Sequence, residues 1–312
     1  MNYLGISTKS LMRTMVIFSL LFHSLIHAQG NNKMGYTTGI NQWYNTREQD
    51  LKMPNGWLNL EGLFWLHKGV NSLGASNGND CKYENSNALD TSFPSHIGNF
   101  IIDGDSVSWE NLNQYQVKIN NIELPLETKI CVYDGKSLNL EMTWSHYSWT
   151  IIKRADKIGV RFRNLESLNL TSFKGIDRFP VNKQWKIKAV LHAPLQSELM
   201  ILNVLGQNLA TKNAGNLSFT YQNKQYNLDV IDEGAQTLFI TFADATSDIT
   251  TYGAGRFIDI VKPDANGNTE IDFNKAYNPP CAFTKFATCP LPPPQNRLPL
   301  AINAGEKTYG RH

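Results

Sequence analysis

The stretch YGAGRFIDIV (residues 252–261), followed by EIDF (270–273) and AYNPPCAFTKFATCPLPPPQNRLPLAINAGEK (276–307), combines two strand patterns with a long proline-rich loop. Seven of the chain's thirteen prolines lie between Pro279 and Pro299. Proline fixes the backbone angle φ and removes a hydrogen-bond donor, so this loop is predicted to be rigid and to lie outside the sheets. A rigid irregular segment rich in polar side chains is typical of a preformed site.

The rest of the chain is dominated by short strand patterns separated by Asn-Gly, Asp-Gly and other turn signals. In WKIKAVLH (185–192), for example, Trp185, Ile187 and Ala189 alternate with lysines, as a half-buried strand requires. A helix is predicted only for Trp43–Lys52, ending before Pro54. Closely spaced short strands favour a β-sandwich or a barrel.

We therefore predict a mainly β protein made of two antiparallel β units. Residues 42–143 are expected to form the first helix and an N-terminal sandwich. Residues 144–307 are expected to form a C-terminal β-sandwich or barrel, which opens with a hairpin around Ala155–Lys157 and is closed by the segment 252–307. We call this last segment, from Tyr252 to Lys307, the signature segment.

The N-terminus has the pattern of a secretory signal peptide over residues 1–28. Lys9 and Arg13 precede an apolar run, and Ala28 offers a small residue for cleavage. Removal of this peptide leaves 27 basic and 27 acidic residues, and no stripe of basic residues suggests binding to nucleic acid. No second apolar run of membrane length follows. We expect an exported protein without a membrane span after cleavage, located in the periplasm or secreted.

Export changes the interpretation of the four cysteines, since disulfides form in oxidising compartments. Cys281 and Cys289 enclose seven residues already stiffened by proline, and a disulfide between them is predicted. Whether Cys81 and Cys131 pair is left open. The signature segment contains no histidine, so no metal site is predicted there, and no cofactor is expected.

Familiar catalytic motifs such as G-x-S-x-G, H-E-x-x-H and the P-loop do not occur in the sequence. The candidate catalytic residues are the carboxylates Asp272 and Glu306. With Asn274, Asp272 is expected on one face of a strand. The two carboxylates can be read as an acid and base pair for hydrolysis, as ligands of a cation, or as partners of Arg256 and Arg297 in a buried structural network.

A set of polar and aromatic side chains in the same segment are candidate ligand contacts. Arginine pairs can grip a carboxylate or phosphate, and tyrosines can stack on a sugar or an aromatic ring. The candidates are Tyr252, Arg256, Asn274, Asn278, Asn296, Arg297 and Lys307.

The strings AYNPPCAF (276–283), CPLPPPQNRLPLAI (289–302) and AGEK (304–307) resemble the C-terminal signature of a bacterial family known as domain of unknown function 1684. TYGAGRF, EIDFNKAYNPP, GWLNLEGLFWL (56–66) and GIDRFPVNKQWKIKAVL (175–191) are similar to the same family. The resemblance implies an architecture over about residues 42–307 but no activity.

The order of strands and turns over residues 69–124 also resembles a forkhead-associated (FHA-like) sandwich. The phosphothreonine-binding version of that fold has an arginine just after an early glycine, whereas here Gly74 is followed by Ala75. The resemblance therefore implies a scaffold without phosphopeptide binding.

Two hypotheses of function follow from these patterns. The first is a binding or structural module whose rigid loop recognises a small polar ligand, a glycan or an envelope protein. The second is an exported hydrolase that uses Asp272 or Glu306 together with Arg256 and Arg297. The second requires these carboxylates to meet at an open pocket, whereas burial in mutual salt bridges would exclude it.

Overall fold

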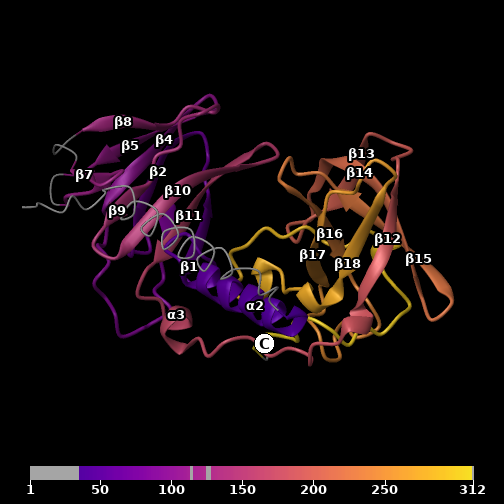
Figure 1. Cartoon of the computed structure of the whole chain (residues 1–312). Coiled ribbons are helices and arrows are strands. Elements are labelled where there is room, and N and C mark those ends of the chain that lie inside the picture. Colours follow the sequence, from indigo (N-terminus) through magenta and orange to yellow (C-terminus); the bar gives the residue numbers. More distant parts are fainter. Residues whose placement is uncertain (1–34, 113–114, 124–127, 311–312) are drawn as a thin grey trace, which may run out of the picture. The chain divides into compact units, whose positions relative to one another are not determined.

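The computed structural model describes residues 35–112, 115–123 and 128–310, so the expected signal peptide lies outside the described residues. Within these ranges the protein is mainly β, and its strands form three sheets (Figure 1), which confirms the predicted fold class. The longest helix, α2 (Tyr36–Lys52), ends where the sequence predicts but begins earlier than Trp43.

Two sheets form a sandwich in the first half of the chain, and their strands pair antiparallel except for β2 and β3, which pair in parallel. The first has the strand order β1-β11-β10-β9-β6-β7 and the second has the order β3-β2-β4-β5-β8. Buried aromatic side chains from both sheets, including Phe100, Trp109, Trp149 and Phe162, fill one core between them. The strands are β1 (Leu60–Trp65), β2 (Gly69–Gly74), β3 (Cys81–Lys82), β4 (Gly98–Asp103), β5 (Ser106–Asn111), β6 (Lys118–Ile119), β7 (Ile122–Glu123), β8 (Lys129–Tyr133), β9 (Met142–Trp144), β10 (Tyr147–Arg154) and β11 (Lys157–Asn164).

A third, seven-stranded sheet forms the C-terminal part. Its order is β17-β16-β15-β14-β12-β18, with β13 paired to β14, and it is nearly closed into a barrel. Ile187 and Ala189 face its core while Lys186 and Lys188 are exposed, as their alternation predicts. The strands are β12 (Lys186–His192), β13 (Glu198–Leu202), β14 (Asn208–Tyr221), β15 (Lys224–Ile231), β16 (Thr237–Phe242), β17 (Arg256–Val261) and β18 (Asn268–Asp272).

The hairpin β10–β11 lies in the sandwich. Ala155 makes its tight turn with a positive φ of 52°, where the sequence expects a hairpin. However, β11 pairs with β1, and β10 pairs with β9. The expected division at residues 143/144 therefore falls inside β9, a strand of the same sheet as β10 and β11, and the change of sheet comes after β11. Strand spacing predicts that a hairpin exists but does not say which sheet it joins.

Short helical turns connect the remaining segments. They are α3 (Leu168–Ser172) and four 3₁₀ turns, η1 (Lys183–Trp185), η2 (Phe273–Lys275), η3 (Pro280–Ala282) and η4 (Pro294–Asn296). After β18 the signature segment forms no further strand, and its backbone pairs with the sheets only through isolated bridges, such as Phe257 with Tyr277 and Ala243 with Arg297. The prediction that the proline-rich loop stays outside the sheets is confirmed.

One local expectation is wrong. Asp272 and Asn274 do not share a strand face, because Asn274 lies in the 3₁₀ turn η2 and Asp272 caps that turn. The Asp272 side chain accepts hydrogen bonds from the backbone N–H and the side-chain amide of Asn274, at 3.1 and 3.0 Å. This local bonding competes with continued strand pairing.

Candidate functional site

Glu306, a candidate catalytic carboxylate, is completely buried, and each of its oxygens has a partner. Its Oε1 lies 3.1 Å from Nε of Arg47 on α2, and its Oε2 accepts the backbone N–H of Asn278 at 2.6 Å. Burial raises the pKa of the carboxyl, against the opposing effect of the Arg47 guanidinium. Glu306 thus fastens the end of the signature segment to α2.

Arg256 is also buried, and it donates hydrogen bonds to backbone carbonyls of the signature segment. Its Nη1 donates to the carbonyl of Ala304 at 2.5 Å, and its Nη2 donates to the carbonyl of Ile302 at 3.1 Å. Its ion-pair partner is Asp244, with 3.4 Å between Nη2 and Oδ2. Burial lowers the pKa of Arg256, and the negative charge of Asp244 acts in the opposite direction. Buried ion pairs therefore exist here, but they are Glu306–Arg47 and Arg256–Asp244 and not the predicted pairing of the two candidate carboxylates with Arg256 and Arg297.

The three candidate asparagines are buried and tie the loop to its surroundings. Asn296 accepts the N–H of Asp229 at 2.7 Å and donates to the carbonyl of Thr241 at 2.8 Å. Asn274 exchanges two hydrogen bonds of 2.9 Å with the backbone of Asn182. Asn278 donates to the carbonyl of Lys307 at 2.7 Å, and these side chains hold the backbone in place.

The other candidates are scattered over the segment. The Tyr252 hydroxyl donates to the carbonyl of Cys281 at 3.2 Å, Arg297 is exposed, and the Lys307 ammonium lies 5.1 Å from the centre of the Phe179 ring. Neither Asp272 nor Glu306 lines any cavity described below. The structure therefore gives no support to an acid and base pair made of these two carboxylates.

Cys281 and Cys289 lie at disulfide distance, with 6.2 Å between their Cα atoms, as the sequence predicts. Cys81 and Cys131 are unpaired, Cys81 buried and Cys131 exposed, which answers the question that their spacing left open. The chain between the paired cysteines is attached to the sandwich, because Thr284 Oγ1 donates to the carbonyl of Leu60 at 2.8 Å.

A pocket of about 570 Å³ lies where this cross-linked turn meets β1. The pocket is lined by three phenylalanines and one buried carboxylate, that of Glu61. Acidic and basic side chains also line it. The lining residues are Leu60, Glu61, Phe64, Lys82, Glu84, Asn85, Ser86, Asn169, Cys281, Phe283, Thr284, Lys285 and Phe286. We call it the Glu61 pocket.

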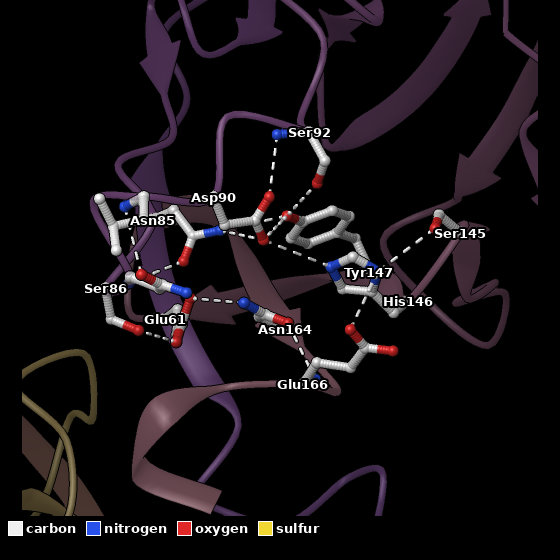
Figure 2. A network of polar contacts seen from close by, with 12 residues as sticks. Glu61, Asn85, Ser86, Asp90, Ser92, Ser145, His146, Tyr147, Asn164 and Glu166 are labelled. Carbon is white, nitrogen blue, oxygen red and sulfur yellow. Dashed lines mark hydrogen bonds and ion pairs between the residues drawn. The ribbon is translucent and has the colours of Figure 1, made fainter. Parts of the chain in front are cut away.

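Glu61 is 5 % exposed and is held by neutral donors (Figure 2). Tyr83 and Ser86 donate their hydroxyls to its two oxygens at 2.5 Å, and Asn164 donates its amide at 3.2 Å. Asn164 also donates to the Tyr83 oxygen at 3.4 Å, which leaves the phenolic hydrogen for Glu61. None of the ion pairs formed among the described residues involves Glu61.

The same network continues to a second carboxylate, Asp90 (Figure 2). Asn85 donates to Asp90 Oδ2 at 2.8 Å, and the Tyr147 hydroxyl lies 3.3 Å from that oxygen. His146 stands between Asp90 and Glu166, at 3.9 and 3.8 Å. The pKa of Asp90 is lowered, and hydrogen bonds from Ser92 make the largest contribution to this shift. The network fixes the loop that carries Asn85 and Ser86.

Sequence reasoning missed Glu61 although a signal was present. In GWLNLEGLFWL, Glu61 is the only charged residue in a dense apolar run. A carboxylate at such a position is buried and needs hydrogen-bond donors or a cation. The donors lie up to 103 residues away, so local pattern alone does not identify them.

The family comparison agrees with the motifs of the signature segment. Residues 171–307 match the family model described as "Protein of unknown function (DUF1684)". These residues are similar to that family, and they make up less than half of the chain. The DUF1684 match begins between β11 and β12, so it covers the seven-stranded sheet and the signature segment, while the resemblance noted over residues 56–66 lies outside it.

A solved structure is similar to part of the chain. It is the solution NMR structure of an uncharacterized protein of Haloarcula marismortui, 27 % identical, with a TM-score of 0.38; the match covers 44 % of this chain and 78 % of that one. No curated protein matches. Among the described residues, no helix is long and apolar enough to cross a membrane, and no group of three or more His, Cys, Asp or Glu side chains is arranged to hold a metal ion.

Proposed function

We propose that this protein is a binding protein for a small ligand with a positively charged group, which the Glu61 pocket receives. The observation that carries this proposal is a buried carboxylate that lines a cavity and has only neutral hydrogen-bond partners.

Electrostatics supports a cationic ligand. A carboxylate removed from water is costly unless hydrogen bonds or an opposite charge compensate it. Oε1 accepts a bond from Ser86, while Oε2 accepts bonds from Tyr83 and Asn164, so Oε1 keeps acceptor capacity for a further donor. An ammonium or guanidinium group would supply both the donor and the charge.

The walls suit the same kind of ligand. Phe64, Phe283 and Phe286 offer aromatic surface, over which a cation is attracted when it is desolvated. The Lys82 ammonium is paired with Glu84 at 2.6 Å, so its charge is compensated. Lys285 is exposed and lies 5.2 Å from the centre of the Phe286 ring.

The signature segment has a structural part in this proposal. Its cross-linked turn, from Cys281 to Cys289, supplies one wall of the pocket, while Glu306, Arg256 and the buried asparagines fix the segment behind it. A wall that is already rigid loses little entropy when a ligand binds, which favours affinity.

We further propose that the protein works outside the cytoplasm, in the periplasm or secreted. The signal-peptide pattern of residues 1–28 and the Cys281–Cys289 pair support this, because a disulfide persists in an oxidising compartment.

The binding proposal is tested by thermal unfolding of the protein from residue 29 onward with a panel of small primary amines, guanidines and quaternary ammonium ions. A compound at 100 times its dissociation constant stabilises the folded state by about 2.7 kcal/mol. We expect a saturable rise in Tm for the wild type and for Glu270→Gln, an exposed carboxylate that does not line the pocket and serves as a control.

Glu61→Gln is expected to lose the rise. Because this change also alters a buried network, Phe286→Ala provides a second variant that weakens binding and leaves the hydrogen bonds of Glu61 in place. If no cation raises the Tm, or if the rise survives in Glu61→Gln, the proposed function is wrong.

A further inference from the structure

A group of arginines lies on the face of β10 and β11 that points away from the sandwich core. In the antiparallel register, Thr150 pairs with Arg161, Ser148 pairs with Arg163, and Arg154 pairs with Lys157. Side chains two positions apart share a face of a strand. Trp149, Val160 and Phe162 fill the core, so Arg154, Arg161 and Arg163 share the opposite face.

None of these arginines has an acidic partner within ion-pair distance among the described residues. Arg154 Nε donates to the Thr288 hydroxyl at 3.2 Å, and Arg163 Nη1 donates to the carbonyl of Gly56 at 3.1 Å. Their hydrogen-bond partners are neutral. Glu141 is the acidic group that acts on the buried Arg163, from beyond ion-pair distance, so the three positive charges are only partly offset.

Arg161 has fewer hydrogen-bond partners among the described residues than Arg154 or Arg163. Its guanidinium lies 5.1 Å from the centre of the Trp57 ring, and its buried Nε has no hydrogen-bond partner. Burial, followed by repulsion from Arg154 and Arg163, lowers the pKa of Arg161 to about 10. A half-buried guanidinium held near like charges without an acceptor is unfavourable unless an anion completes the group.

We propose that Arg154, Arg161 and Arg163 form a binding site for a phosphate group, separate from the Glu61 pocket. Guanidinium groups present several N–H donors in a fixed plane, which match the oxygens of phosphate and can bond them in pairs. The Trp57 ring lies against the Arg161 guanidinium and helps to hold it in place. The phosphate group belongs either to free inorganic phosphate or to a small phosphate ester.

Calorimetric titration of the protein from residue 29 onward tests this site, with sodium phosphate and glycerol 3-phosphate as separate probes. Sodium chloride at the same ionic strength is the reference, because general screening must be excluded. We expect saturable heat with at least one probe, and the comparison of the two probes distinguishes the free ion from an ester.

Arg161→Met keeps the apolar stem against Trp57 and removes the charge, so we expect at least a tenfold loss of phosphate affinity. Without phosphate its Tm should equal or exceed that of the wild type, because an uncompensated charge is gone. Lys136→Gln removes an exposed charge in another turn and should bind as the wild type does.

If Arg161→Met does not fold, Arg154→Gln carries the same expectation of weaker binding. Absence of saturable heat in the wild type overturns the proposal, and so does unchanged affinity in both arginine variants. Neither result affects the test of the Glu61 pocket, which uses cations and other variants.

Discussion

At the scale of single residues, the partner of each buried charge decides what that charge does. Glu306 and Arg47 are 259 positions apart in the chain, yet their side chains meet at 3.1 Å in a buried environment. Glu61 has no such cation and faces a pocket. The sequence singles out Glu306 as a candidate acid, whereas its environment makes it a structural anchor and makes Glu61 the better candidate for a ligand contact.

Glu306→Gln is therefore expected to destabilise the protein strongly. Removing one member of a buried ion pair leaves the other uncompensated and costs about 3 to 5 kcal/mol. Asp272→Asn is the matched control, because asparagine caps a helical turn as well as aspartate does, and should change stability by less than about 1 kcal/mol. Urea unfolding at pH 7 measures both variants, and equal stability of the two would contradict the anchor role.

A pH dependence follows from Asp80. Its carboxylate accepts the N–H and the hydroxyl of Ser72, both at 2.9 Å, and these bonds hold its pKa at about 2, below the ordinary 3.8. Because the folded-state pKa is depressed, the stabilisation is fully present above pH 3.8 and is lost as the pH falls to about 2.

Thermal unfolding between pH 4 and pH 2 is therefore expected to show a steeper fall of Tm for the wild type than for Asp80→Asn. Asp156→Asn, at an exposed position in the β10–β11 turn, is the comparison and should follow the wild type. Parallel curves for wild type and Asp80→Asn would refute the role of Ser72.

At the scale of elements, the signature segment is a rigid connector. It is fixed at one end by the Glu306–Arg47 pair, along its length by Asn296 and Arg256, and at its cross-linked turn by Thr284 and the disulfide. Proline keeps the part of the segment after β18 out of the sheets, so side-chain hydrogen bonds and isolated bridges attach that part to its surroundings.

Loss of the disulfide should loosen this turn. Cys281→Ser combined with Cys289→Ser is expected to cost about 2.5 kcal/mol, because the closed loop spans eight positions and restricts the unfolded chain. Cys131→Ser, at an exposed free cysteine, should have no effect. Urea unfolding under oxidising conditions checks this, and a double variant as stable as wild type would show that the cross-link contributes nothing.

At the scale of the whole molecule, strand pairing groups the elements differently from their order in the chain. The hairpin β10–β11 completes the sandwich with β1, and the DUF1684 match begins only after it. The turn between Cys281 and Cys289 is bonded to Leu60 and lines the pocket with Glu61, so the proposed binding site draws on both halves of the sequence.

The proposed export is tested with protein that includes residues 1–28. Expression from Met1 in a bacterial host should yield protein outside the cytoplasm with Gln29 as its first residue, because the pattern before Ala28 favours cleavage there. Reversing the charges of Lys9 and Arg13 should impair both export and cleavage. Cell fractionation with N-terminal sequencing is the measurement, and uncleaved cytoplasmic protein would contradict the proposed location.

The sequence by itself determined the mainly β class, the helix end at Lys52, the hairpin at Ala155, the Cys281–Cys289 pair and the DUF1684 motifs, because each depends on neighbouring residues. The tertiary structure alone decided that Glu306 meets Arg47 and that Glu61 lines a pocket. It also placed Arg154, Arg161 and Arg163 on one face, where none of them forms an ion pair with another described residue. Such contacts join distant parts of the chain, and they depend on how sheets pack and on which charges are removed from water together.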